Sequence, residues 1–188
     1  MGGGKMKAFK TIVVTTVILT LICGIAAAGL ALVNELTSDR IAAAEQKAEQ
    51  EAMARVITAD EFLEDTVTVN GVEHKYYTAV TGGTQIGYIF TVSKHGYGGN
   101  VKVMTGIGTD GKIIAVEVLD ASGETPGLGQ NVTKKTFWEQ FKGLSGSLAV
   151  GGNVEAVTGA TISSKAVTAC VNEALDLYKI AEGDGSNG

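Results

Sequence analysis

An uncharged, mostly apolar run from Thr11 to Val33 limits what the start of this chain can form. A helix rises 1.5 Å per residue, so about 23 residues span roughly 34 Å, enough to cross the hydrocarbon core of a bilayer. Three lysines precede the run, and Glu35 is the first charge after it. Positive loops tend to stay in the cytoplasm. We therefore expect residues 1–10 to be cytoplasmic, residues 11–33 to be a transmembrane helix and the remainder to be extracytoplasmic.

A cleaved signal peptide is the alternative interpretation of this run, with Ala26-Ala27-Ala28 as the small-residue cleavage site. The apolar run continues to Val33, which is longer than a typical signal core and favours a retained anchor. A lipoprotein is disfavoured because Ile22 precedes Cys23 where a small residue is needed. Met6 stands where a myristoylation signal has Ser or Thr. In both interpretations the soluble part is exported.

Residues 34–60 are predicted to form a helical stalk. Ala, Glu, Gln and Lys, which are good helix formers, dominate from Glu35 to Val56. The apolar stripe of this segment is weak, so we expect a partly solvated helix. Two roles stay open for it, a spacer and a contact surface for a neighbouring subunit.

From Thr66 onward the sequence changes to short β-like runs bounded by turn residues. Asn70-Gly71 predicts a hairpin, and Thr109-Asp110-Gly111 predicts another. Strands are predicted over residues 66–69, 72–80, 86–93, 101–107 and 113–119, and helices over residues 133–141 and 165–180. This succession predicts an α+β domain with an antiparallel sheet and flanking helices over residues 61–181. Residues 182–188 are predicted to be a disordered tail.

Charge and residue usage exclude several classes of function. The net charge of −5 argues against a nucleic-acid partner. Cys23 and Cys170 fall in very different segments, so an internal disulfide is not expected. Only His74 and His95 are available as imidazole ligands, and no metal-ligand spacing is present. We therefore expect no zinc, haem or iron–sulfur site built by this chain alone.

The stretch Thr158–Ser164 brings hydroxyl groups, a glycine and a predicted helix start to one place. Ser163 and Ser164 are candidate N-caps, and Gly159 permits a tight turn and close approach by a ligand. A helix N-terminus favours an anion, because its first N–H groups are free and the helix dipole is positive there. Two interpretations follow, a turn with its cap and a seat for a phosphate.

Two glycine-rich stretches precede it. Residues 124–129, Glu-Thr-Pro-Gly-Leu-Gly, hold the only proline of the chain beside permissive glycines. Such a loop can bring backbone N–H groups to a planar ring while Leu128 packs on its face; the alternative is a surface turn. Residues 95–99, His-Gly-Tyr-Gly-Gly, are predicted to form a flexible turn.

Thr158-Gly159-Ala160-Thr161 resembles the (Ser/Thr)-Gly-Ala-Thr motif of flavin-carrying membrane redox subunits. In those proteins a flavin transferase joins FMN to the last threonine through a phosphoester. The matching residue here is Thr161. The motif usually has an aspartate six residues earlier, where this chain has Glu155.

Five stretches, taken in order, resemble the FMN-binding domain of the G subunit of the Rnf complex. They are Gly-Tyr-Gly-Gly at residues 96–99, Asp-Gly-Lys-Ile at residues 110–113, Glu-Thr-Pro-Gly-Leu-Gly at residues 124–129, Phe137–Phe141 and Thr158–Thr161. The C subunit of the sodium-pumping NADH:quinone reductase is similar. The short chain, and the pairing of Gly-Tyr-Gly-Gly with Glu-Thr-Pro-Gly-Leu-Gly, favour the Rnf family. The resemblance covers nearly the whole chain and implies a transmembrane helix followed by an extracytoplasmic FMN-binding domain.

The function that the resemblance implies is electron transfer by covalently bound FMN. The complex would pass electrons from ferredoxin to NAD⁺ and couple this to translocation of Na⁺ or H⁺. This redox subunit, without a complete active site of its own, would relay electrons between other membrane subunits. Its further partners would be a flavin transferase and the lipid bilayer.

The resemblance also implies roles for individual residues. Thr161 would carry the phosphoester, and N–H groups near Ser163 and Ser164, with Lys165, would neutralise the phosphate. The ring contacts would come from Glu124, Thr125, Leu128 and Gly129, while Trp138 and Tyr97 are open between stacking on the flavin and packing elsewhere.

Two other functions stay open. One is a stand-alone tethered flavoprotein that passes electrons to an extracellular acceptor. The other, of a different class, is a flavin-free anchored sensor or adhesion domain.

Overall fold

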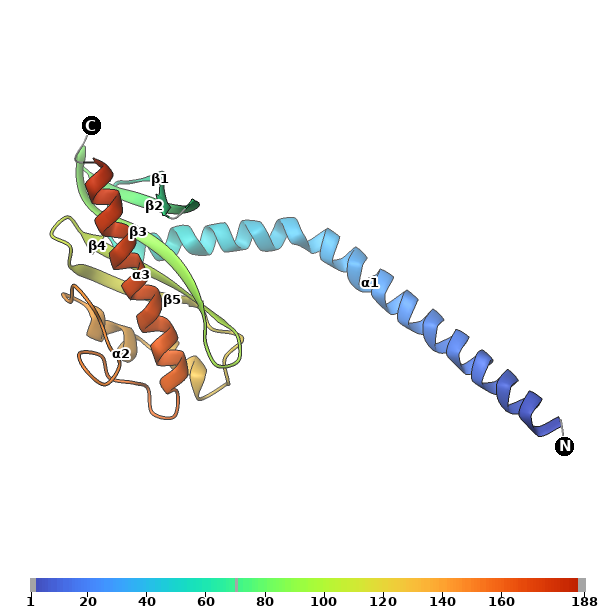
Figure 1. Ribbon diagram of the computed structural model, residues 1–188. Coiled ribbons are helices and arrows are strands. Elements are labelled where there is room, and N and C mark those ends of the chain that lie inside the picture. The colour runs from blue at the N-terminus through green and yellow to red at the C-terminus, as the bar shows by residue number, and fades with distance from the viewer. Residues whose placement is uncertain (1–2, 70, 186–188) are drawn as a thin grey trace. The chain divides into compact units, whose positions relative to one another are not determined.

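The computed structural model describes residues 3–69 and 71–185 (Figure 1). A long helix, α1, is followed by an antiparallel sheet and a final long helix, α3. The bounds are α1 Gly3–Val56, β1 Glu61–Val69, β2 Val72–Thr81, β3 Thr84–His95, β4 Asn100–Gly108, β5 Ile113–Asp120, η1 Gly129–Thr133, α2 Lys135–Trp138, η2 Glu139–Phe141 and α3 Thr161–Gly185. The chain divides into two compact units, Met1–Lys47 and Ala48–Gly188.

The first unit is the N-terminal part of α1. It contains a segment, Ile12–Ser38, that is long and apolar enough to cross a membrane by length and composition. Large apolar side chains along it are exposed, as Leu30 is. Thr16 and Thr20 each donate their hydroxyl to the carbonyl four residues earlier, at 2.9 Å. Such bonds keep hydroxyl groups satisfied in an apolar environment.

The last two turns of α1 belong to the second unit rather than to a solvated stalk. Met53 and Val56 are buried against the sheet. Gly106 of β4 makes room for Val56 and Ile57, because a Cβ there would lie 2.4 Å from Val56 Cγ1 and 2.9 Å from Ile57 Cγ1. Arg55 in the same turns is exposed, so this end of α1 is buried on one face and solvated on the other. The few apolar side chains at the end of α1 hold it on the sheet because they pack against Gly106, which has no side chain and lets the helix approach closely.

The sheet is a five-stranded antiparallel meander in the order β1-β2-β3-β4-β5, which confirms the antiparallel α+β prediction. Each strand pairs with the next along the chain. The expected hairpin is present, with Val69 opposite Val72, although Asn70 of its turn lies outside the described residues. β1 begins at Glu61, earlier than the run predicted from Thr66.

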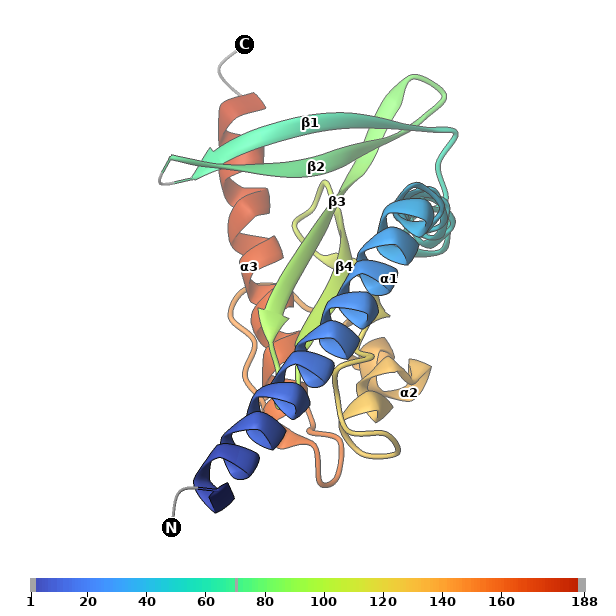
Figure 2. The same cartoon turned by 90° about the vertical axis from the view of Figure 1, so that its right-hand side faces the viewer.

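The two faces of the sheet have separate cores. Val103 and Ile107 of β4 belong to the core that includes the apolar face of α3, while Met104 between them packs with the end of α1. α3 lies along the sheet over β3 and β4 (Figure 2). Side chains of β4 therefore contribute to both cores, because successive side chains of a strand point to opposite faces of the sheet.

α3 is longer than predicted at both ends. It begins at Thr161 instead of Lys165 and continues to Gly185 instead of Ile180. The expected disordered tail is therefore wrong for residues 182–185, and residues 186–188 lie outside the described part of the chain. Leu177, Tyr178 and Ala181 are buried, so the apolar face that holds the helix extends past Ile180.

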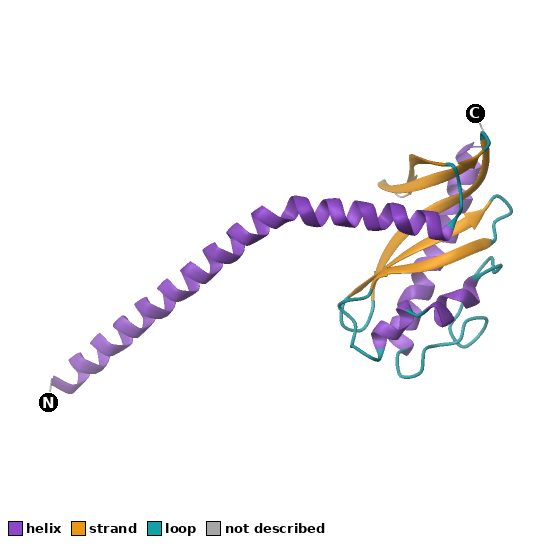
Figure 3. Ribbon diagram, turned by 180° about the vertical axis from the view of Figure 1, so that it is seen from behind, coloured by secondary structure: helices purple, strands orange, loops and turns teal. Residues whose placement is uncertain are grey.

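The region between β5 and α3 is mostly loop, with three short helical turns, η1, α2 and η2 (Figure 3). They replace the single helix predicted over residues 133–141. Phe137 and Phe141 are buried with their rings edge to face and 5.7 Å apart. This aromatic pair anchors the loops that carry the candidate site.

Candidate functional site

A cavity of about 540 Å³ opens at the start of α3. Three loops that are distant in sequence form it: one after β3, one between β5 and η1, and one leading into α3. Its lining residues are Tyr97, Glu124, Thr125, Leu128, Gly129, Gly159, Ala160, Thr161, Ile162 and Ser163. Most of the predicted site residues therefore meet in one place. A cavity of this volume is within the range that holds small-molecule cofactors.

A tight turn sets the start of α3 at Thr161. Gly159 has φ +75°, a conformation that glycine adopts without strain, and the Ala160 N–H donates to Val157 O at 2.9 Å. The first N–H used within the helix is that of Ser164, which donates to Ala160 O at 2.9 Å. The N–H groups of the preceding three residues have no intrahelical acceptor. The cavity thus faces the positive end of the α3 dipole.

Ser163 and Ser164 are not N-caps, so that prediction is wrong. The helix begins earlier than expected, and both serines lie buried within its first turn. Ser164 Oγ donates to Ala160 O at 2.9 Å and accepts from the Val157 N–H at 3.0 Å. Ser163 Oγ donates to Glu124 Oε2 at 2.5 Å. Both hydroxyl groups therefore donate their proton to bonds within the fold.

Glu124 is a buried residue, only 2% exposed. Its Oε1 accepts from the N–H groups of Tyr97, at 2.7 Å, and Gly98, at 3.3 Å. Burial raises its pKa, but hydrogen bonds from Ser163, Tyr97 and Gly98 outweigh that effect, and the pKa lies below its ordinary value. Glu124 lines the cavity as an ionised group whose two oxygens are already bonded within the fold.

Glycines surround this carboxylate because there is no room for a side chain. A Cβ on Gly96 would lie 2.1 Å from Glu124 Oε1, and a Cβ on Gly129 would lie 2.5 Å from Glu124 Oε2. The glycine-rich stretch after β3 is therefore an anion-binding loop for an internal carboxylate, and not the flexible turn expected. Glu124 and this glycine-rich stretch are both evident in the sequence, but no local pattern indicates that they contact each other.

The rim of the cavity is apolar and exposed. Tyr97 is 68% exposed, Ile162 52% and Leu128 46%, and Thr161 lies among them with an exposed side chain. A hydroxyl group at an open helix end, beside apolar side chains, suits a ligand with a phosphate and a planar ring. Sequence reasoning missed Ile162; its position directly after Thr161 was the available signal.

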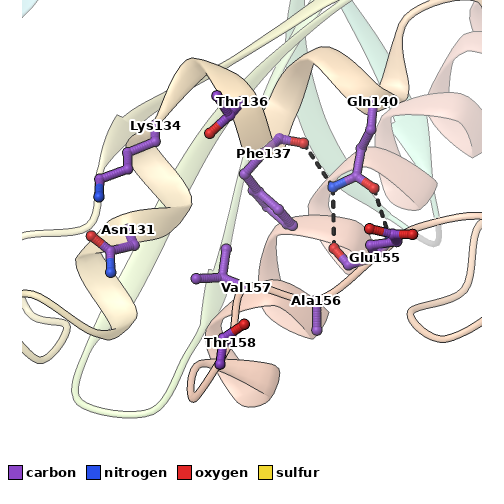
Figure 4. A pocket seen from close by; sticks show the side chains of 9 residues that line it. All are labelled: Asn131, Lys134, Thr136, Phe137, Gln140, Glu155, Ala156, Val157 and Thr158. Atoms are coloured by element: carbon purple, nitrogen blue, oxygen red, sulfur yellow. Dashed lines mark hydrogen bonds between the residues drawn. The ribbon is translucent and has the colours of Figure 1, made fainter.

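A second cavity, of about 620 Å³, lies on the segment that precedes Thr161, and Figure 4 shows its lining. Thr158 and Glu155 belong to this cavity rather than to the first. The side-chain amide of Gln140 holds the segment in place: its Oε1 accepts from the Glu155 N–H at 2.7 Å, and its Nε2 donates to Glu155 O at 3.2 Å.

Two candidates lie elsewhere. Lys165 is exposed and lines neither cavity, although it is one helical turn after Thr161 and so shares its face of α3. Trp138 lines a different cavity, with Arg55 and Lys135, and donates its Nε1–H to Thr133 O at 3.0 Å. Stacking of Trp138 on a ligand held at Thr161 has no support in this geometry.

Residues 96–176 match the family model described as FMN-binding domain, and this range contains every residue that lines the first cavity. The match defines the class, a protein with an FMN-binding domain. Residues 6–56 match a second family model, the RnfG N-terminal region, which coincides with nearly all of α1.

Relatives cover almost the whole chain. The G subunit of the proton-translocating ferredoxin:NAD(+) oxidoreductase complex from Clostridium ljungdahlii is 36% identical, over 92% of this chain and 94% of that protein. The G subunit of the Na(+)-translocating complex from Acetobacterium woodii is 31% identical, over 91% and 93%. The G subunit of an ion-translocating oxidoreductase complex from Methanosarcina acetivorans is also 31% identical, over 95% and 100%. The chain belongs to the family of Rnf complex G subunits.

Among solved structures, the C subunit of the Na(+)-translocating NADH-quinone reductase from Parabacteroides distasonis aligns with a TM-score of 0.47 and 25% identity. The alignment covers 56% of this chain and 61% of that one.

The family and the apolar segment Ile12–Ser38 together indicate a membrane-anchored protein.

Proposed function

We propose that this chain carries one FMN, joined by a phosphoester to Thr161, and relays electrons between subunits of an Rnf-type complex. The observation that carries the proposal is the place of Thr161. It is the first residue of α3, its side chain is exposed, and it lines a cavity with an apolar rim. Family membership supports the electron-transfer role, since the relatives are subunits of ferredoxin:NAD(+) oxidoreductases.

The phosphate would be stabilised by the open end of α3. The N–H groups of Thr161, Ile162 and Ser163 have no intrahelical acceptor, and the helix dipole adds to them. Lys165, one turn along the same face, would add a positive charge from solvent.

The ring would lie against the apolar rim. Leu128 and Ile162 offer exposed apolar surface in the cavity that Thr161 lines, and Tyr97 offers an aromatic face. Thr125 lines the same cavity and offers a hydroxyl group for a polar edge. When bound, FMN supplies the capacity to accept and donate electrons, while the chain positions it and excludes water from one side.

Attachment requires a separate flavin transferase and an activated flavin nucleotide. Thr161 Oγ1 would bond to the FMN phosphorus, the bond from that phosphorus to a nucleoside monophosphate leaving group would break, and the hydroxyl proton would pass to a base of the transferase. The segment that precedes Thr161 lines the second cavity, and its residues Glu155 and Thr158 are exposed (Figure 4).

The proposal includes the orientation of the chain in the membrane and its role in the complex. Residues 1–10 would lie in the cytoplasm, and the domain that starts at Ala48 would lie outside. The subunit would work with the other membrane subunits, in the bilayer, to couple ferredoxin oxidation and NAD⁺ reduction to Na⁺ or H⁺ translocation.

The test is flavin fluorescence of the denatured chain, taken from membranes of cells with an active flavin transferase. The wild-type band should fluoresce, and the peptide containing Thr161 should carry the mass of FMN. Thr161→Ala should abolish the fluorescence, while Thr84→Ala, at an exposed threonine at the start of β3, should keep it. Fluorescence retained in Thr161→Ala, or a dark wild-type band, would overturn the assignment.

A further inference from the structure

The carboxylate of Glu124 joins the three loops of the cavity. It accepts from the Tyr97 and Gly98 N–H groups on one oxygen and from Ser163 Oγ on the other. Ser163 lies two residues after Thr161 in the first turn of α3. We propose that Glu124 is the positioning residue of this site, and that its fixed negative charge lowers the reduction potential of the FMN that the proposed function places on Thr161.

The environment of Glu124 contains donors but no counter-ion. Within the described residues, no ion pair includes this carboxylate. A buried charge is costly unless it is hydrogen-bonded or paired, and here two backbone N–H groups and one hydroxyl group satisfy it. The bonds stabilise the anion without cancelling its charge. Its field therefore reaches the cavity that it lines.

The contacts also explain how Glu124 can act on Thr161 without touching it. The short bond to Ser163 holds the first turn of α3 against the loop that begins at Glu124. The two N–H bonds hold the loop after β3 on the opposite side, with Tyr97 at the rim. Because one carboxylate bridges these segments, loss of Glu124 should release Tyr97 and Ser163 together.

The electrostatic consequence follows from the charge added on reduction. Reduced FMN carries more negative charge than oxidised FMN, so a fixed anion nearby disfavours the reduced form more. The low-dielectric surroundings of a buried carboxylate strengthen this effect. Removing the charge while keeping the shape should therefore make the midpoint potential more positive.

The experiment compares full-length chains made with an active flavin transferase, in native membranes. Glu124→Gln removes the charge, Ser163→Ala removes one bond but leaves the charge, and Glu117→Gln removes a charge that pairs with Arg55 outside this cavity. The readouts are the midpoint potential of the bound flavin, and amide hydrogen exchange of Tyr97 and Gly98 in unmodified chain.

We expect Glu124→Gln to shift the potential to more positive values and to speed exchange at both amides. Ser163→Ala keeps the charge of Glu124, so its midpoint potential should lie closer to the wild-type value than that of Glu124→Gln. Glu117→Gln should change neither the potential nor the amide exchange. An unchanged potential and unchanged exchange in Glu124→Gln would overturn the proposal, as would an equal shift in Glu117→Gln.

The two proposals fail in different ways. If the wild-type chain carries no flavin, the proposed function fails, while amide exchange still tests whether Glu124 holds the loop. If Glu124→Gln does not fold, Ser163→Ala decides, because Ser163 carries the bond from Glu124 to the first turn of α3. Unchanged exchange at the Ser164 amide together with unchanged flavin attachment would then overturn the positioning role.

Discussion

Ser163 and Glu124 lie 39 residues apart in the sequence and meet through a hydrogen bond of 2.5 Å between Ser163 Oγ and Glu124 Oε2. Both residues are buried. The bond links the first turn of α3 to the loop after β5, and the Tyr97 N–H adds the loop after β3 through the other carboxylate oxygen. The candidate site is therefore organised around an internal anion, with the proposed cofactor residue Thr161 in the same helical turn.

Replacing Gly129 by alanine should disrupt this arrangement. Its Cβ would lie 2.5 Å from Glu124 Oε2 and 2.9 Å from Ser163 Oγ, so the carboxylate would have to move. Overpacking of this kind typically costs about 1–3 kcal/mol. We expect a loss of that size in the free energy of unfolding, measured by denaturant titration, together with less bound flavin.

Gly183→Ala is the matched control, because Gly183 is helical and a Cβ there meets nothing within 4 Å. It should be neutral or stabilising by up to roughly 1 kcal/mol. Equal effects of the two substitutions would show that the cavity around Glu124 tolerates a methyl group.

The free energy of unfolding should decrease at low pH, in part because Glu124 becomes protonated. Its pKa in the folded chain lies below the ordinary value of 4.5 that applies when unfolded. Its contribution is therefore complete above the unfolded pKa and is lost as the pH falls through the folded pKa. Asp120, whose pKa is also lowered, chiefly by hydrogen bonds from Ser122, contributes in the same direction.

The measurement is the free energy of unfolding of wild type and Glu124→Gln between about pH 3 and pH 7. The difference between the two should be largest near neutrality and shrink below about pH 4.5. A difference that stays constant with pH would mean that the charge of Glu124 does not stabilise the fold.

Leu128→Ala should expose the proposed ring without releasing it. Leu128 is 46% exposed at the rim, so its loss costs little stability, while the ester at Thr161 is formed by other atoms. We expect unchanged flavin content but stronger quenching of flavin fluorescence by iodide. Leu63→Ala, an equally exposed leucine on β1, should leave quenching unchanged.

Gly106→Ala should destabilise the second unit by separating α1 from the sheet. The added Cβ would lie 2.4 Å from Val56 Cγ1 and 2.9 Å from Ile57 Cγ1, and both side chains are buried. A cost of about 1–3 kcal/mol is expected for overpacking of this kind. Adding Val56→Ala to the Gly106→Ala chain should restore part of the lost free energy of unfolding. No restoration would show that the clash with Val56 is not the cause of the loss.

Much of the fold followed from local patterns. Alternating runs and the Asn70-Gly71 signal predicted the strands and their antiparallel order, because side-chain period and turn chemistry act over a few residues. The candidate site was partly predictable for the same reason. Gly159 and Thr161 belong to one short turn, and the loop of residues 124–129 carries its own proline and glycines.

The role of Ser163 depended on a contact that no local pattern contains. The helix begins at Thr161, so the expected cap Ser163 is a buried residue of the first turn, and its hydroxyl group bonds to Glu124, 39 residues earlier.

The sequence by itself determined the apolar N-terminal run, the succession of strands and the hydroxyl-glycine turn that presents Thr161, since each is set by neighbouring residues. Only the tertiary structure decided that Glu124 bonds to Ser163 and to the loop after β3, and that the end of α1 packs on Gly106. A buried carboxylate takes whichever donors the folded sheet brings to it, and a helix packs closely where the opposing strand has no side chain. Both outcomes depend on segments that are distant along the chain.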